Sequence, residues 1–256
     1  MTPLDQRNRS AVTLIIPTVH HRAPLYARAL RQLSRAGFRG PIIVSDHSPP
    51  EHAHAIAEIT KRHGELDINV LWHAPDTHFL TRLSRCTAAA ETPYVHLHAD
   101  DDFLVVAMLD RLVGEMERTA GCVAALGLNL HLRLDTGQIS LLLKTANQYS
   151  SPFERLIAQL ESYSSVLYAL RRREELIANF SYTVERCPTS SSGSILRAAS
   201  QRSAGRLCSS TICTTCARFT RTSGRRPWSG NARPSTSPTS DLPPSSHRAW
   251  RLFAPH

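Results

Sequence analysis

Three consecutive carboxylates, Asp100, Asp101 and Asp102, follow an apolar-alternating segment that begins at Tyr94. This alternation is typical of a β-strand, and Pro93 ends any helix that precedes it. The carboxylates are therefore predicted at the carboxyl end of a strand, which is where open α/β sheets bind their ligands.

Adjacent carboxylates repel one another by roughly 1 to 4 kcal/mol per pair at about 4 Å, so a partly buried cluster favours a cation. Mg²⁺ and Mn²⁺ take oxygen ligands and commonly bridge to the phosphates of a substrate. We therefore predict a metal and diphosphate site at this cluster of carboxylates. The alternative is a solvated acidic turn that caps the next helix.

The segments upstream alternate between strand and helix patterns. Strands are predicted at residues 12–18, 41–46 and 67–72, each a short run rich in β-branched residues, with a helix after each. Such alternation predicts parallel βαβ units, in which all strand ends face one crevice. The fold class is thus α/β, with a mostly parallel, Rossmann-like sheet flanked by helices.

The charge of the 256-residue chain is unevenly distributed. Residues 187–256 hold ten Arg, one Asp, no Lys and no Glu, and therefore carry the whole net charge of +9. This segment also holds fifteen Ser and seven Pro without a periodic apolar face, which predicts a disordered tail. We hypothesise that a frameshift near codon 187 replaced the native C-terminus, since such composition arises from a G+C-rich sequence read out of frame. No nucleic-acid partner is expected, because residues 1–186 are charge-balanced.

No membrane-spanning segment is expected, because no run reaches the roughly 18 to 20 apolar residues that a bilayer requires. Residues 1–10 are polar and the first apolar run stops at Pro17, which argues against a signal peptide. Only Cys86 and Cys122 lie within residues 1–186, so a disulfide framework is not predicted there. We expect a cytoplasmic protein, with peripheral attachment to a membrane as the alternative.

Four parts of the sequence match a known family in their order and spacing. They are the strands at residues 12–18 and 41–46, Arg85, and residues 94–102. Together they resemble the nucleotide-sugar-binding half of family 2 glycosyltransferases of the GT-A fold. The resemblance implies a nucleotide-sugar-binding domain at residues 1–118 and a partial acceptor-side region at 119–186. It further implies metal-dependent transfer of a sugar from a nucleotide-diphosphate donor to a hydroxyl acceptor, with inversion.

The same resemblance implies roles for individual residues. Asp46 would contact the nucleobase and Arg85 the diphosphate, with Arg82 as a second cation on the same helix. Asp100 and Asp102 would hold the divalent metal, and Pro17, Thr18 and Asp101 would complete the donor site. The sequence departs from the family pattern at two places, since it reads His98-Ala-Asp-Asp before Asp102 and Asp46-His-Ser-Pro after the second strand.

The catalytic base cannot be assigned from the sequence. Two carboxylates are candidates by position only. Glu154 lies in a capping box that opens a helix predicted to reach Asn179. Asp135 lies in a predicted hairpin turn between strands. The charged residues 171–175 are predicted to form a solvated helix face, with phosphate binding as the alternative. The numerous histidines lack the spacing of zinc ligands.

Two further functions stay open. A nucleotidyltransferase would share the sheet and the carboxylates, but it normally carries a glycine-rich basic loop after the first strand, and residues 18–22 contain no glycine. The chain could also be a catalytically impaired remnant that binds a nucleotide without transferring a sugar.

Overall fold

The computed structural model describes residues 11–133, 135–142, 149, 151–161, 167–186, 206–208 and 216–220. All of these residues belong to one compact unit, residues 1–222. The predicted division of the chain at residues 118 and 186 stays a prediction.

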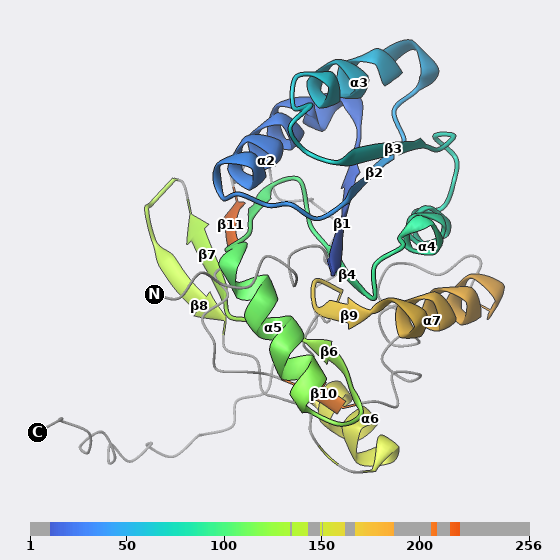
Figure 1. Cartoon of the computed structure of the whole chain (residues 1–256), viewed down its shortest axis with the longest axis vertical. Helices are drawn as coiled ribbons and strands as arrows, with labels where there is room; N and C mark the ends of the chain where they lie inside the picture. The colour runs from blue at the N-terminus through green and yellow to red at the C-terminus, as the bar shows by residue number, and fades with distance from the viewer. Residues whose placement is uncertain are drawn as a thin grey trace, which may run out of the picture. The chain divides into compact units, whose positions relative to one another are not determined.

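A seven-stranded sheet forms the centre of this unit, in the order β10-β6-β9-β4-β1-β2-β3 (Figure 1). Strands β1 to β4 run parallel to one another, whereas β9 is antiparallel to both β4 and β6. The bounds are β1 Val12–Thr18, β2 Ile42–Asp46, β3 Ile68–Trp72, β4 Tyr94–Leu97, β6 Cys122–Ala125, β9 Leu170–Arg172 and β10 Arg206–Cys208. The predicted mostly parallel α/β sheet is thereby confirmed.

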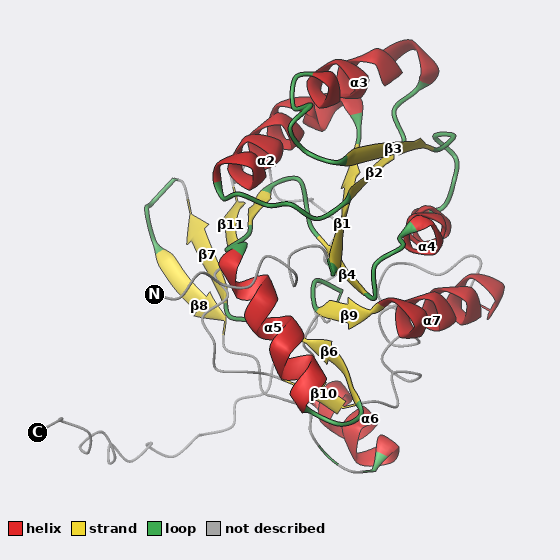
Figure 2. Cartoon of the chain, in the orientation of Figure 1, coloured by secondary structure: helices red, strands yellow, loops and turns green. Residues whose placement is uncertain are grey.

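Helices cover both faces of this sheet (Figure 2). Their bounds are α2 Ala23–Arg35, α3 Ala53–Lys61, α4 Phe79–Ala89, α5 Ala107–Arg118, α6 Pro152–Glu161 and α7 Arg173–Arg186. The alternation of side chains along β1 divides the core between the two faces. Leu14 and Ile16 pack in one cluster with residues of α2, α3 and α5, and Ile15 packs in a second with residues of α4 and α7.

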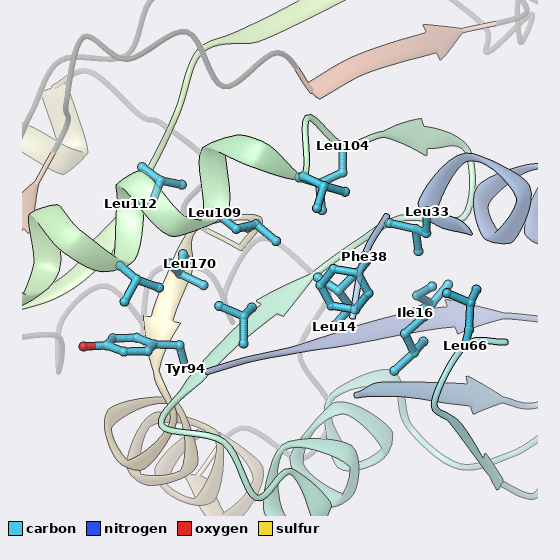
Figure 3. Packing of buried hydrophobic residues seen from close by; sticks show 14 of the residues in the cluster. Leu14, Ile16, Leu33, Phe38, Leu66, Tyr94, Leu104, Leu109, Leu112 and Leu170 are labelled. Carbon is cyan, nitrogen blue, oxygen red and sulfur yellow. The ribbon is translucent and has the colours of Figure 1, made fainter. Parts of the chain in front are cut away.

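The larger cluster joins the strands to α5 through Leu14, Tyr94, Leu109 and Leu170 (Figure 3). Leu14 and Leu170 are fully buried. Complete burial of a Leu or Ile side chain stabilises a fold by about 1.5 to 3 kcal/mol. These strands are therefore rigid supports for the loops that follow their carboxyl ends.

A smaller four-stranded sheet has the order β5-β11-β7-β8. Its strands are β5 Asp102–Phe103, β7 Asn129–Arg133, β8 Ile139–Leu142 and β11 Cys216–Thr220. The predicted hairpin is confirmed, since β7 and β8 pair antiparallel across a turn in which Gly137 has φ 69°. The sequence pattern from residue 122 to 134 favours one continuous strand, but β6 and β7 are separate strands in different sheets.

The helix predicted from Ser151 to Asn179 also requires correction. Helix α6 ends at Glu161, and β9 precedes a new helix, α7. Arg171 pairs with Val95 of β4 and is buried, so its assignment to a solvated helix face was wrong. Pairing with strands distant in sequence overrides the local helical pattern here.

Two strands lie within the predicted tail. β10 pairs with β6, and β11 pairs with β5 and β7, so these eight residues differ from the expected disorder. The rest of residues 187–256 lies outside the described residues, and the frameshift stays a hypothesis. Within the described part of the chain, no helix is long and apolar enough to cross a membrane.

Candidate functional site

A pocket of about 400 Å³ lies at the carboxyl ends of β1 and β4. It is lined by Pro17, Thr18, Val19, Arg22, His47, Phe79, Arg82, Leu83, Leu97, Ala99, Asp100, Asp101, Leu167 and Tyr168. Parallel strands end at the same edge of a sheet, so the loops after β1, β2 and β4 converge there. The position agrees with the crevice that the sequence predicted.

Five of the predicted site residues, Pro17, Thr18, Arg82, Asp100 and Asp101, line this pocket. Asp46 is buried beside it, where its Oδ1 accepts a hydrogen bond of 2.9 Å from the backbone N–H of Ser48. Its neighbour in sequence, His47, does reach the lining. A nucleobase contact of Asp46 stays a prediction.

Asp102 and Arg85 are not part of the lining. Asp102 is buried in β5, opposite Arg218 of β11. Arg85 is exposed on α4. Phe79, Arg82 and Leu83 are spaced three and four residues apart and share the helix face that lines the pocket, whereas Arg85 lies off that face.

Arg22 forms the closest contacts with the predicted metal ligands, and sequence reasoning gave it no role. Its Nε donates to both carboxylate oxygens of Asp100, at 2.9 and 3.0 Å, and its Nη2 donates to Asp100 Oδ1. The same Nη2 lies 3.1 Å from Asp101 Oδ2. These bonds, above all those with Asp100, raise the pKa of Arg22 despite the opposing effect of burial. Arg22 is therefore a permanent cation in the acidic cluster.

The acidic loop is held in place by β1 and α2. Thr18 Oγ1 donates to Asp100 Oδ2 at 2.9 Å. Arg28 Nη2 donates to the carbonyl oxygen of Asp101 at 2.8 Å, and Gln32 Nε2 donates to that of Leu104 at 2.8 Å. Since these contacts come from the neighbouring strand and helix, the carboxylates occupy fixed positions.

Arg82 is the second cation of the pocket, and its environment differs from that of Arg22. Its side chain is buried, and its guanidinium lies 5.4 Å from the ring centroid of Phe79. Among the described residues, its Nε and Nη1 have no hydrogen-bond partner. Burial lowers the pKa of Arg82 because it disfavours the charged form. A buried guanidinium without a partner is costly, so an anion in the pocket would stabilise it.

Two histidines next to the pocket are held neutral. Burial, with a smaller contribution from Arg82, lowers the pKa of His47, whose Nδ1 lies 2.9 Å from the carbonyl oxygen of Thr18. Burial likewise lowers the pKa of His73, and raises the pKa of Cys86 to about 11. The Cys86 thiol is thus protonated at neutral pH and is a poor nucleophile.

The donor groups present do not fit a divalent cation. Both oxygens of Asp100 accept hydrogen bonds from Arg22 and Thr18, Asp101 contacts Arg22, and Asp102 lies outside the lining. Nowhere in the described residues do three or more His, Cys, Asp or Glu side chains gather in an arrangement that could hold a metal. A guanidinium thus stands where the sequence predicted a metal.

Neither candidate for the catalytic base reaches the pocket. Asp135 is exposed at the β7–β8 turn and accepts a hydrogen bond of 2.8 Å from Arg133. Glu154 is exposed on α6. The predicted alternative of phosphate binding by residues 171–173 gains no support, since none of these three residues lines the pocket.

Comparison with solved structures identifies glycosyltransferases as structural neighbours. The TarS protein of S. aureus, residues 1–349, matches with a TM-score of 0.56 and 14% identity, over 81% of this chain and 60% of that fragment. The same fragment in complex with UDP-GlcNAc matches with a TM-score of 0.57 and 11% identity, over 83% of this chain and 59% of the fragment. A third match is the mannosyltransferase PcManGT from Pyrobaculum calidifontis, in complex with GDP-Man and Mn²⁺. Its TM-score is 0.56 and its identity 16%, over 84% of this chain and 58% of PcManGT.

The protein therefore has a GT-A-like glycosyltransferase fold, with a pocket at the carboxyl edge of its sheet. The chain spans about 60% of the length of these neighbours. No protein-family model matches the sequence, and no curated protein matches it either.

Proposed function

We propose that the protein is a glycosyltransferase that binds a nucleoside-diphosphate sugar in this pocket and transfers the sugar to a hydroxyl acceptor. The observation that carries the proposal is Arg82, a buried guanidinium that lines the pocket with two nitrogens unpaired among the described residues. Guanidinium groups bind phosphate oxygens through parallel hydrogen bonds. The nucleotide sugars in the neighbouring structures support a diphosphate as the anion.

The remaining lining suits the other parts of such a donor. Leu83, Leu97, Leu167 and Tyr168 supply apolar surface beside the polar groups. Ligand pockets typically combine an apolar wall with a few fixed polar groups. At the end of β2, the neutral ring of His47 offers a surface for a nucleobase, next to the predicted base contact at Asp46.

Transfer would proceed by attack of the acceptor oxygen on the anomeric carbon of the sugar. The bond from that carbon to the diphosphate breaks as the new bond forms, and its electron pair stays with the leaving diphosphate. Arg82 would stabilise the negative charge that develops there. A single displacement of this kind inverts the anomeric carbon, which agrees with the family resemblance. As the new bond forms, the acceptor hydroxyl gives its proton to a general base.

A second candidate function is nucleotide binding without sugar transfer. It is favoured by the positions of the two candidate bases, since neither Asp135 nor Glu154 lines the pocket. Both functions share the donor pocket and differ only in turnover. Incubation with a donor that is radiolabelled in its sugar separates the two functions. Turnover, by transfer or by hydrolysis, separates the labelled sugar from the nucleoside diphosphate, and binding alone does not.

Isothermal titration with UDP-GlcNAc and GDP-Man tests the proposed function. We expect one of them to bind, and Arg82→Gln to weaken that binding by about ten- to a hundredfold, since a hydrogen bond to a charged group contributes about 1.5 to 3 kcal/mol. Arg85→Gln is the matched control, because it removes the same charge from the exposed face of α4. Equal losses in the two variants, or no binding of any nucleotide sugar by the unaltered chain, would refute the proposal.

A further inference from the structure

We propose that Arg22 is a built-in cation that replaces a divalent metal ion, so that this protein binds its nucleoside diphosphate without metal. The inference rests on the proposed function, because it concerns the same pocket. It is carried by the contacts of Arg22 with both carboxylates of the pocket.

The hydrogen bonds of Asp100 explain why a metal would have to displace Arg22. Oδ1 accepts from Nε and Nη2 of Arg22, and Oδ2 accepts from Nε of Arg22 and from Thr18 Oγ1. The Asp100 side chain is 2% exposed. A cation that bound to these oxygens would break several charge-assisted hydrogen bonds and would lie directly beside a guanidinium of the same sign.

The position of Arg22 is fixed by the local structure. It ends the short helix η1, His20–Arg22, and its backbone N–H donates to the carbonyl oxygen of Val19 at 2.8 Å. Helix α2 starts at the next residue. The Arg22 side chain is therefore held at its base by the backbone after β1, and at its guanidinium by the carboxylates after β4.

The guanidinium also reaches the space in which a ligand would lie. Arg22 lines the pocket, and its side chain is 35% exposed, in contrast to the buried Asp100. The hydrogen bonds to the two aspartates use its Nε and Nη2. Its Nη1 has no hydrogen bond to the described residues and can donate to a phosphate oxygen. Arg22 can thus link an anionic ligand to the carboxylates, which is the part that a bridging metal ion would otherwise take.

Arg22 and Arg82 together provide two cations for one diphosphate. Arg22 extends from the β1 side of the pocket and Arg82 from α4. Because Arg22 balances one of the two carboxylates, the acidic loop does not repel the diphosphate as strongly as two unpaired carboxylates would. The pocket therefore accommodates an anion without an added cation.

The test is titration of the full chain with UDP and GDP, in EDTA and then in Mn²⁺. We expect binding in EDTA, with a dissociation constant that Mn²⁺ changes by less than about threefold. Arg22→Gln should weaken binding in EDTA by about ten- to a hundredfold and make binding depend on Mn²⁺, because the freed carboxylates can then hold the metal. Arg31→Gln, on the exposed face of α2, is the control and should behave as the unaltered chain.

Electron paramagnetic resonance of Mn²⁺ gives a second readout that does not depend on the nucleotide. The unaltered chain should leave Mn²⁺ free, and Arg22→Gln should bind it. Circular dichroism checks the fold of the variant, and Arg22→Lys, which keeps the charge, should retain binding in EDTA. Nucleotide binding that requires Mn²⁺ in the unaltered chain would overturn the role of Arg22 and leave the proposed function intact. Absence of binding under both conditions would overturn the proposed function itself.

Discussion

Acidification should destabilise this fold through His96, whose imidazole is buried in the central strand β4. His96 lies in register with Leu14 of β1 and Leu170 of β9, and its Nδ1 has no partner among the described residues. Burial, with a smaller contribution from His98, lowers the pKa of His96 to about 3. The two rings are 6.3 Å apart between centroids. Protonation of either ring therefore places a charge in an apolar interior.

The magnitude follows from proton linkage. The folded pKa of about 3 lies below the ordinary value of 6.5, so the unfolded chain takes up the proton first as the pH falls. The stabilising contribution of neutral His96 is thus complete above pH 6.5 and is lost progressively between pH 6.5 and about pH 3. At about pH 5 the loss is roughly 2 kcal/mol, at 1.36 kcal/mol per pH unit.

Urea unfolding followed by circular dichroism, at about pH 7.5 and pH 5, measures this loss. Carboxylates also contribute to the pH dependence, but His96→Gln leaves their part unchanged. We therefore expect the loss of unfolding free energy between the two pH values to be smaller by roughly 2 kcal/mol in His96→Gln. His54→Gln, an exposed site on α3, should match the unaltered chain. An unaltered pH dependence in a cooperatively unfolding His96→Gln would refute the reasoning.

Three other predictions concern stability and the extent of the folded unit. Leu14→Ala should cost about 2 to 5 kcal/mol of unfolding free energy by urea titration, since Leu14 is fully buried, whereas Leu141→Ala at an exposed site should cost less than about 0.5 kcal/mol. Arg172→Met should cost about 1 to 3 kcal/mol in the same assay, because the Arg172 side chain donates to the carbonyl oxygens of Cys122 and Met116. A chain that ends at residue 186 lacks β10 and β11, and should therefore melt several degrees below a chain that ends at residue 222. Equal melting temperatures would argue against the pairing of β10 with β6 and of β11 with β7.

The sequence predicted the donor half of the fold because its patterns are local. Residues 12–18 form β1 with side chains buried on both faces, as a β-branched run in a parallel sheet requires. Gly37 has φ 71° just after α2, the left-handed conformation in which a glycine commonly ends a helix. The strand β9 could not be predicted in this way, since Leu170 and Arg171 become a strand only through pairing with β4 and β6.

The site was predicted in part for a similar reason. Residues at a strand end or shortly after it, such as Thr18 and Asp100, were correctly brought to one edge by the βαβ pattern. The family resemblance pointed to Arg85, whereas Arg82 is the arginine of α4 that lines the pocket. The diphosphate contact of Arg85 stays a prediction. Arg22 was missed because its contacts with Asp100 span 78 residues. The sequence did contain one indication of this contact. Arg22 is a basic residue shortly after the first strand, at the sheet edge where the acidic cluster was predicted.

The most direct test of a nucleoside-diphosphate site is the crystal structure of the full chain with UDP-GlcNAc or GDP-Man bound. We expect a diphosphate in the pocket at the ends of β1 and β4, with phosphate oxygens within about 3.2 Å of guanidinium nitrogens of Arg82 and Arg22. A diphosphate bound elsewhere on the molecule, or one in the pocket without contact to Arg82, would contradict it.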